Sequence, residues 1–519
     1  MELPGRWVAA SSSRLRPLLP LALLVVAFAV LVQASGANQA SHYALVRALD
    51  AGTARIDRWE AETVDKALVD GHYYSVKAPG LALATLPWFA ATDRVGLLGA
   101  VRRAGEREAR EDPVPDPRAQ AVREQRTVVW LLGLWAVVLP ALALLLLVRG
   151  AAERVAPGTG TAAAVVLGLS TLVLPYSTML YAHVPAAALA FGAYVLAQRR
   201  RFLLAGVLAG LAGLVEYPVA LVGLVLLCAT RSLRFGAGFV AGLLPLAAYN
   251  LWAFGSVTHM SYEDVVGFAG QDEGLFGITL PDPGAAWDLL LAPKGFLVLT
   301  PVVAAGVYGL VRARLWVPLT VVAVTFLYDA AYYLPFGGDV PGPRFLVPML
   351  PFLALGIAVA LRARPAPTLA LAAASAVSML AATISEPQLV GDDTNRWVDL
   401  MRDGDLQFTI AGAAGAGHGW LGITPFLALV LAAIALAAPE PAAGGPARPL
   451  AGAAPLAAAT LAAWALVALL LGDSAVLVGA GALAGVGAMV WSGRSAACSG
   501  KARSPAPSTA SSTTGTPRS

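Results

Sequence analysis

Long runs of apolar residues, separated by short polar segments, make up most of this 519-residue chain. Many runs are close to 20 residues long, which is the length an α-helix needs to cross the hydrocarbon core of a bilayer. Lipid offers no hydrogen-bond partners, so a crossing backbone is expected to close its own hydrogen bonds as a helix. The pattern therefore predicts an all-α fold, a polytopic transmembrane helical bundle of about 12–14 spans.

The first span is expected near residues 16–34, as a retained anchor rather than a cleaved signal peptide. The next is expected near residues 127–148, after a long polar interval. Further spans are expected near residues 160–178, 182–198, 202–215, 217–230, 235–253, 295–311, 315–333, 345–361, 367–384, 421–437, 451–471 and 475–491.

Arginines in the short loops orient this bundle. Arg6, Arg14 and Arg16 precede the first span, and cytoplasmic loops carry an excess of basic residues, so both chain termini are expected in the cytoplasm. The clusters of basic residues in the later loops all lie on the cytoplasmic side only if the span at 127–148 runs from outside to inside. Residues 79–98 are then expected to touch the outer interface without crossing, within a first outer loop that bears interfacial helices.

The pattern divides the chain into a transmembrane domain and a smaller C-terminal part. Hydrophobic residues are 58% of the chain, charged residues are 13% and the mean hydropathy is +0.69, which excludes a soluble protein. The net charge of +4 does not indicate a nucleic-acid partner, because the basic residues lie in short loops. The predicted parts are a transmembrane domain at 1–437 with its first outer loop at 35–126, a linker at 438–450, an accessory transmembrane hairpin at 451–491 and a disordered cytoplasmic tail at 492–519.

The densest polar segment is residues 50–80, in the first outer loop. It holds several acids, the cluster His72-Tyr73-Tyr74, and Lys77 just before a Pro-Gly turn. Asp57 and Asp65 are eight residues apart, so a helix here would place both on one face. The preceding SHYALVRALD, residues 41–50, is typical of an amphipathic helix lying on the membrane. We take Asp65 and Asp57 as candidate catalytic residues and Lys77, Tyr74 and His72 as candidate substrate-binding residues.

Three ionisable residues near helix ends are further candidates for binding substrate. An ionisable group next to hydrocarbon is a functional hypothesis by default, and His183 and Glu216 both border apolar runs. Arg344 follows an outer Pro-Gly-Pro turn, against the usual inside bias, and a guanidinium there matches a lipid phosphate. The alternatives are an interfacial histidine, a structural carboxylate and an ordinary headgroup contact.

The order of these segments resembles the GT-C superfamily of integral-membrane glycosyltransferases, which includes protein mannosyltransferases and the aminoarabinose transferases of lipid A. GHYYSVKAPGLALATLPWF resembles the Tyr-x-x-Lys-x-Pro-Gly region of that family. The blocks LPYSTMLYAHVPAAALAF, LVEYPVALVGLVLL, LLLAPKGFLVLTPVVAAGVYGL and GGDVPGPRFLVPMLPFLAL resemble later blocks in an uncharacterised bacterial branch. The resemblance covers roughly residues 16–365.

The resemblance implies transfer of a sugar from a polyprenyl-phosphate donor to an extracytoplasmic acceptor at the plasma (inner) membrane. A carboxylate would deprotonate the acceptor hydroxyl in a displacement with inversion, with Asp65 as the first candidate base and Asp57 as the second. Lys77 and Arg344 would stabilise the departing phosphate. His183 and Glu216 would line the cavity beneath.

One motif departs from the family pattern. Many relatives carry an Asp-Glu pair directly after the first span, where a divalent metal or the acceptor is engaged, whereas this chain has Asn38-Gln39. No acidic pair therefore supports a divalent metal, and the cofactor stays unknown. Two other functions stay open: a transporter or flippase of a lipid-linked or small solute, and a non-catalytic membrane assembly protein.

Overall fold

The computed structural model describes residues 16–501 except 112, 411, 413–418 and 438–453. Helices dominate the described chain, which confirms the predicted helical class, and the strands form two small antiparallel pairs, β1 with β4 and β2 with β3. The N-terminal elements are η1 (Arg16–Leu18), α2 (Leu19–Val30), β1 (Leu31–Val32), α3 (Ala37–Asp50), η2 (Glu60–Glu62), β2 (Lys66–Val69), β3 (His72–Ser75), α4 (Gly80–Arg94), α5 (Leu97–Glu111), α6 (Pro117–Gly133), the π-helical turn η3 (Leu134–Val138) and α7 (Leu139–Val155).

The remaining elements are almost all helical. The middle of the chain forms α8 (Gly160–Leu169), α9 (Val173–Tyr176), α10 (His183–Gln198), α11 (Phe202–Val215), η4 (Tyr217–Val219), α12 (Ala220–Thr230), α13 (Leu233–Phe254), η5 (Ser261–Asp264), η6 (Ala269–Asp272), α14 (Pro283–Leu291), α15 (Phe296–Leu299), α16 (Val302–Arg312), α17 (Trp316–Ala330) and η7 (Arg344–Met349). The C-terminal part forms α18 (Leu350–Ala363), α19 (Pro365–Ile384), α20 (Asn395–Asp403), β4 (Phe408–Thr409), α21 (Gly419–Leu436), α22 (Ala454–Leu470) and α23 (Ala475–Lys501).

Fewer helices than expected have the length of a full membrane span. Within the described residues five are long and apolar enough to cross, or six if the bent pair formed by α14–α15 and α16 is one span. Shorter apolar helices, such as α10 and α11, account for other spans that the sequence suggested. The expected helix at 160–178 ends at Leu169, where the chain turns into the short α9. The five helical segments long and apolar enough to cross are Pro117–Val155, Leu233–Phe254, Arg344–Ala363, Pro365–Ile384 and Gly419–Leu436.

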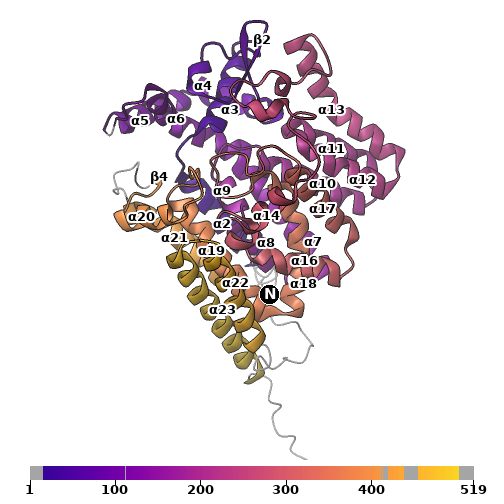
Figure 1. The fold of residues 1–519 in the computed structure, drawn as a ribbon, viewed down its shortest axis with the longest axis vertical. Coiled ribbons are helices and arrows are strands. Elements are labelled where there is room, and N and C mark those ends of the chain that lie inside the picture. The colour runs from indigo at the N-terminus through magenta and orange to yellow at the C-terminus, as the bar shows by residue number, and fades with distance from the viewer. Residues whose placement is uncertain (1–15, 112, 411, 413–418, 438–453, 502–519) are drawn as a thin grey trace, which may run out of the picture.

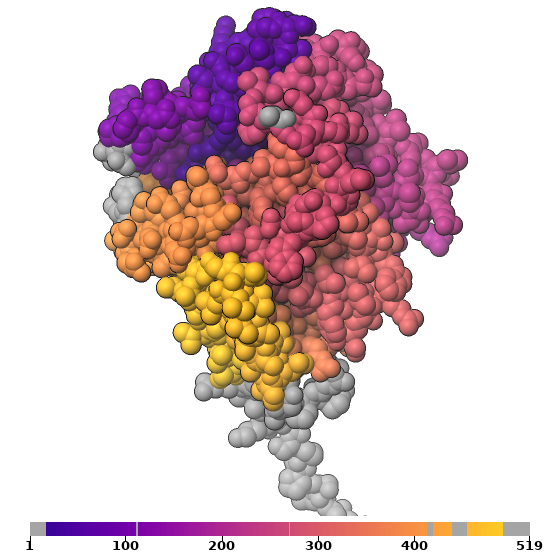
Figure 2. Space-filling model, in the orientation of Figure 1, coloured from indigo at the N-terminus to yellow at the C-terminus, as the bar shows by residue number. Residues whose placement is uncertain are grey.

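The elements that follow the first helix gather at one end of the molecule. Figure 1 shows α3, β2 and α4 near the top of the long axis, while α22 and α23 extend toward the opposite end. Figure 2 shows the same division on the surface, where α22 and α23 form a separate ridge below α20. The expected polar outer loop is thus gathered into one structured cap.

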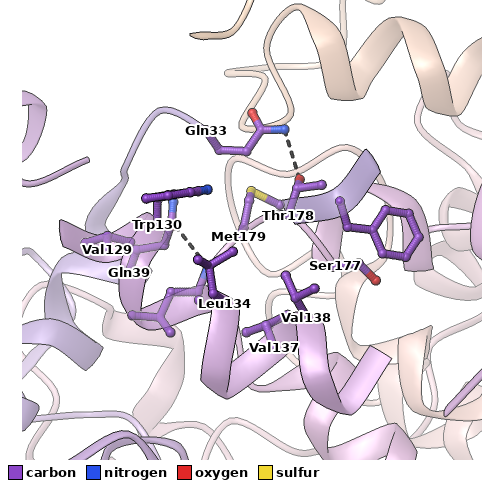
Figure 3. Close-up of a pocket in the computed structure, with 13 residues that line it drawn as sticks. Gln33, Gln39, Val129, Trp130, Leu134, Val137, Val138, Ser177, Thr178 and Met179 are labelled. Atoms are coloured by element: carbon purple, nitrogen blue, oxygen red, sulfur yellow. Dashed lines mark hydrogen bonds between the residues drawn. The ribbon is translucent and has the colours of Figure 1, made fainter. Parts of the chain in front are cut away.

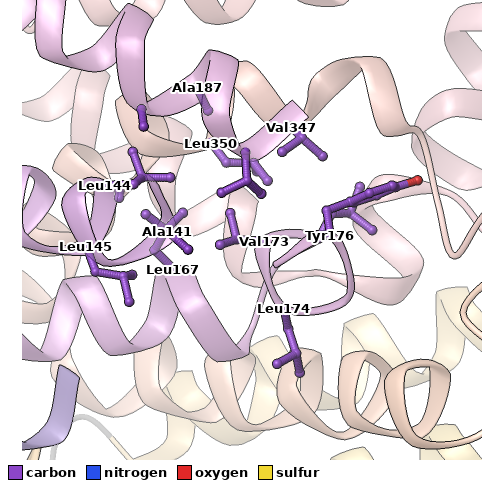
Figure 4. Packing of buried hydrophobic residues seen from close by; sticks show 14 of the residues in the cluster. Ala141, Leu144, Leu145, Leu167, Val173, Leu174, Tyr176, Ala187, Val347 and Leu350 are labelled. Atoms are coloured by element: carbon purple, nitrogen blue, oxygen red, sulfur yellow. The ribbon is translucent and has the colours of Figure 1, made fainter. Parts of the chain in front are cut away.

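Apolar side chains from distant segments fill the centre of the bundle. Leu144 of α7, Leu167 of α8 and Leu350 of α18 are fully buried in one apolar cluster. Val173 and Val347 belong to the same cluster (Figure 4). Moving such a side chain from water into the core contributes roughly 1.5–3 kcal/mol to the free energy of folding. Where the helices are surrounded by lipid, close packing between side chains holds them together instead. The cluster fixes α8, α10 and η7, which lead into the site.

Small residues allow α11 and α13 to pack closely. A Cβ added at Gly206 of α11 would overlap the carbonyl oxygen of Phe235 in α13, and one at Gly238 would overlap that of Leu203. Glycines allow two backbones to approach this closely, which is how many membrane helices associate. α11 and α13 therefore form a rigid pair, and the C-terminal end of α11 is held in place.

Three local expectations differ from the structure. α3 is a helix, as expected, but it is buried on most sides by protein, so it is an internal helix rather than one lying on a membrane. Residues 57–65 form turns and η2, not one helix, so Asp57 and Asp65 do not share a helical face. α23 runs to Lys501, so the segment expected to be disordered from residue 492 begins as helix; the rest of it and the linker at 438–450 lie outside the described residues, as do Arg6 and Arg14.

Candidate functional site

A polar cavity lies where α3, the start of α4, the start of α10, the end of α11 and η7 converge. It encloses about 370 Å³ of empty space, including some open solvent. Tyr217 and Tyr262 form part of its wall together with Phe345. Its ionisable and amide side chains are Asn38, His42, Lys77, His183, Glu216 and Arg344.

A two-stranded hairpin brings Asp65 and Lys77 together. In the β2–β3 register Lys66 is opposite Ser75, so the residues that flank these strand ends are neighbours. The Lys77 Nζ lies 2.6 Å from the Asp65 Oδ2, and both side chains are largely buried, with 11% and 14% of their surface exposed. Ser41 of α3 donates a hydrogen bond to the Asp65 carbonyl, which ties the hairpin to α3. This ion pair is therefore anchored by backbone on both sides.

Burial and the charge of the partner shift the pKa of each member of this pair in opposite directions. Burial raises the pKa of the Asp65 carboxyl, but the adjacent Lys77 ammonium and its hydrogen bond outweigh burial, so the pKa falls below the ordinary value. Burial lowers the pKa of Lys77, and the nearby Arg344 lowers it further, against the effect of Asp65. Burial also holds the pKa of His42 well below its ordinary value, with Lys77 adding to the effect. Positive charge is thus concentrated and poorly hydrated here.

A glycine contact joins this hairpin to α11. A Cβ added at Gly80, the first residue of α4, would lie 2.7 Å from the Leu214 carbonyl oxygen near the end of α11. Contacts below 3.0 Å are essentially never seen for a real Cβ. The small residue at this turn allows Lys77 and Glu216 to face one cavity.

His183 and Glu216 form the second pair of the site. The His183 Nδ1 lies 2.5 Å from the Glu216 Oε1, and only 5% and 9% of the two side chains are exposed. His183 is the first residue of α10, and Glu216 follows the last residue of α11 in an extended conformation. The rings of Tyr176 and Phe345 meet the imidazole edge to face, with ring centres 5.0 and 6.0 Å away. The imidazole is therefore fixed in orientation.

Arg344 has no carboxylate within ion-pair distance among the residues that the structure describes. Its guanidinium carbon lies 5.0 Å from the Phe345 ring centre, and its Nε has no hydrogen-bond partner within the described chain. Gly337 has φ of +81°, and a side chain there would overlap the guanidinium, so the Gly-Gly turn makes room for Arg344. The cavity thus holds a cation that lacks an anion.

The structure brings five of the eight candidate residues together and places three elsewhere. Asp65, Lys77, His183, Glu216 and Arg344 lie in or directly behind the cavity wall. Asp57 and His72 pair with each other on the exposed hairpin, with the His72 Nδ1 3.0 Å from the Asp57 Oδ2. The Tyr74 hydroxyl accepts a hydrogen bond from Arg55, and its ring packs on Phe254. These three residues do not line the cavity.

Sequence reasoning missed His42, Tyr217 and Tyr262 as cavity residues. The sequence did carry a signal for His42. It follows Asn38 by four residues, and residues four apart on a helix lie on the same face, so the two polar side chains face the same way. Tyr217 and Tyr262 meet edge to face, with ring centres 5.2 Å apart, although 45 residues of chain and a hydrophobic helix pair separate them. No local pattern predicts that contact.

A second, mostly apolar cavity of about 310 Å³ lies behind the first turn of α3. The π-helical turn η3 and the segment before α10 form its walls, and Figure 3 shows Gln33 and Thr178 across from Trp130. The Gln33 side-chain amide donates to the Thr178 hydroxyl at 2.9 Å, and the Gln39 side-chain oxygen Oε1 accepts a hydrogen bond from the Leu180 backbone N–H at 3.1 Å. The side-chain amides of Gln33 and Gln39 therefore hold the segment that leads into α10 against the N-terminal part of α3 and the residues just before it.

Neither a metal cluster nor a relative identifies the chemistry. Across the described residues, no group of three or more His, Cys, Asp and Glu side chains is arranged to hold a metal ion. No family model, curated protein or solved structure matches the chain. What the protein does is therefore argued from its motifs and from the geometry of the polar cavity.

Proposed function

We propose that this protein is an integral-membrane glycosyltransferase that transfers a sugar from a polyprenyl-phosphate donor to an acceptor outside the cytoplasm, with inversion at the sugar carbon. The observation that carries the proposal is the cation Arg344, without a carboxylate partner in the described chain, beside Lys77 in one enclosed cavity. A buried unpaired cation is expensive unless an anion joins it. A phosphate on a lipid supplies that anion at a membrane.

The two cations match the charge that develops during transfer. The acceptor oxygen bonds to the anomeric carbon of the donor while the bond from that carbon to the phosphate oxygen breaks, and the electron pair leaves with the polyprenyl phosphate. The planar guanidinium of Arg344 suits two phosphate oxygens, and the Lys77 ammonium contributes a point charge. Donors placed in advance where charge develops are a large source of catalysis.

Asp65 takes the role of counter-ion in this arrangement. The resemblance to the GT-C superfamily implies Asp65 as general base, with Asp57 as the second candidate. The low pKa of Asp65 makes it a weak base, and Asp57 lies on the exposed hairpin. We therefore assign to Asp65 the positioning of Lys77 before the donor phosphate arrives.

Transport of an anionic lipid is a second candidate, favoured by one observation. The bent pair of α14–α15 (283–299) and α16 (302–312) turns by 92° at its break. Discontinuous helices are frequent in transporters, where they border the substrate path. The test below separates movement of the donor from transfer of its sugar.

Membranes that contain the full chain would be incubated with polyprenyl phosphates that carry different radiolabelled sugars. Wild type should release polyprenyl phosphate and pass the label to an acceptor. Arg344→Gln should lower the rate by about 100-fold, the usual loss for one transition-state donor. Arg312→Gln, an exposed arginine at the end of α16, is the matched control and should keep the wild-type rate.

Three results would contradict the proposal. Wild type would transfer no sugar from any donor, or Arg344→Gln would keep the full rate, or the donor would cross the bilayer of reconstituted vesicles with its sugar still attached. The last result would favour the transporter.

A further inference from the structure

The buried His183–Glu216 pair lies in the wall of the same cavity as Lys77 and Arg344, and the donor phosphate proposed above does not need it as a counter-ion. Each partner also keeps one polar atom without a hydrogen-bond partner in the described chain, the His183 Nε2 and the Glu216 Oε2. Buried polar atoms are nearly always paired, so two free atoms on neighbouring side chains call for a physical reason.

Stability does not supply that reason. Glu216 lies between the C-terminal end of α11 and the N-terminal end of η4, so the dipoles of the two helices act on its charge in opposite directions, and burial adds a desolvation penalty. Replacing a buried ion pair with apolar residues of similar shape is often neutral or stabilising. A buried pair that carries a desolvation penalty and leaves two polar atoms unmatched within the described chain is better explained by chemistry at the cavity.

The hydrogen bond between the two side chains decides which imidazole nitrogen is available. A carboxylate only accepts hydrogen bonds, so the Nδ1–H of His183 donates to Glu216 and Nε2 keeps its lone pair. The edge-to-face contacts with Tyr176 and Phe345 stop the ring from turning. This is the arrangement in which a carboxylate orients a histidine that accepts a proton through its other nitrogen.

We propose that His183 is the general base of the sugar transfer and that Glu216 is the residue that positions it; the inference rests on the function proposed above. As the acceptor oxygen bonds to the anomeric carbon, its proton passes to the His183 Nε2. The carbon–oxygen bond to the phosphate breaks, and polyprenyl phosphate leaves as the anion beside Arg344 and Lys77. Glu216 stabilises the imidazolium that forms.

The charges in the cavity agree with His183, rather than Asp65, as the residue that accepts the proton. Asp65 is occupied by Lys77, whereas the His183 Nε2 is free. A proton that moves to His183 creates positive charge next to Glu216, so the site gains an ion pair as the donor loses its sugar. The ionisable groups that face His183 from the surrounding elements are Glu216, Arg344, Lys77, His42, Tyr176 and Tyr181.

The test is the pH dependence of transfer by the full chain in membranes, with the same labelled donors. Wild-type kcat should rise with pH along an acidic limb as His183 loses its proton. His183→Gln should lower kcat by about 100-fold with little change in KM for the donor, since Lys77 and Arg344 still bind phosphate. Glu216→Gln should move the midpoint of the acidic limb to lower pH, because the variant lacks the negative charge that favours the imidazolium.

Two further variants keep the test decisive. His183→Ala leaves space at the cavity, so added imidazole should restore part of the transfer. His259→Gln replaces a histidine outside the cavity, which pairs with Asp264, and should leave kcat and the acidic limb unchanged. Thermal melting of each variant separates loss of fold from loss of chemistry.

The results that overturn the inference differ from those that overturn the function. If wild type transfers sugar but His183→Gln keeps kcat within a few-fold, or if imidazole restores nothing to a folded His183→Ala, His183 is not the base. If Asp65→Asn alone removes the acidic limb, Asp65 is the base. If wild type transfers no sugar, the proposed function falls and this role falls with it.

Discussion

Two of the histidine–carboxylate pairs in this protein have the same chemistry but lie in different parts of the fold. His183–Glu216 joins α10 to the end of α11, and His72–Asp57 joins β3 to the turn that precedes η2. In each pair the imidazole Nδ1 meets a carboxylate oxygen, at 2.5 and 3.0 Å. The side chains of the first pair are 5% and 9% exposed, and those of the second are 40% and 42% exposed.

The difference shows that burial, and not residue type, distinguishes a pair in a candidate site from a pair that only stabilises a local turn. Asp57 also accepts a hydrogen bond from the Tyr73 backbone, so its pair completes the hairpin in contact with water. Water screens such a pair and makes its net contribution small. The His183–Glu216 pair is buried, so the charges of Lys77 and Arg344 act on His183 with little screening by solvent.

The largest expected effect follows from breaking each pair by the same change. Glu216→Ala should lower the free energy of unfolding by about 3 kcal/mol, because it leaves the buried Nδ1–H of His183 without an acceptor. Asp57→Ala is the matched control and should cost less than about 1 kcal/mol, since solvent replaces the partner. Denaturant unfolding of the purified protein in detergent measures both, and equal losses would contradict the comparison.

A second prediction perturbs the backbone beneath the buried pair. Gly80→Val places a side chain against the Leu214 carbonyl oxygen, so α4 and Lys77 must move away from α11. Overpacking of this kind costs about 1–3 kcal/mol, and sugar transfer should fall as well. Gly150→Ala, inside α7 with no atom within 4 Å of the added Cβ, should keep or raise the melting temperature. A valine tolerated at position 80 would show that the contact with α11 is dispensable.

The smallest expected effect is on the thermal stability of the protein at acidic pH. Because the pKa of Asp65 is lowered in the folded protein, its carboxylate stabilises the fold above the ordinary pKa of about 4, and this contribution is lost as pH falls through the lowered value. The melting temperature of wild type should therefore drop between pH 5 and pH 2 by more than that of Asp65→Asn. Lys77→Met should flatten the curve in the same way, since the Lys77 charge lowers the pKa. Parallel curves for all three proteins would argue against a stabilising pair.

The sequence was informative wherever structure depends on neighbours in the chain. Apolar runs with a helical length predicted the helical class, and the Pro-Gly turn after Lys77 correctly indicated a break before the helix that begins at Gly80. Isolated charges at the ends of apolar runs identified His183, Glu216 and Arg344, which the fold does bring to one cavity. These signals are local, because a helix closes its own hydrogen bonds and an ionisable group next to lipid is costly wherever it occurs.

The tertiary structure decided which charges meet. The register of β2 and β3 places Asp65 beside Lys77 and leaves Asp57 with His72, a choice that the sequence could not make because both acids lie in the same polar stretch. Packing of α3 inside the cap added His42, which the amphipathic pattern had assigned to a membrane surface. The partner of His183 lies 33 residues away across a helix contact. By itself the sequence determined which residues carry charge in an apolar chain; their pairing and burial depend on contacts between distant segments, and no local period encodes those contacts.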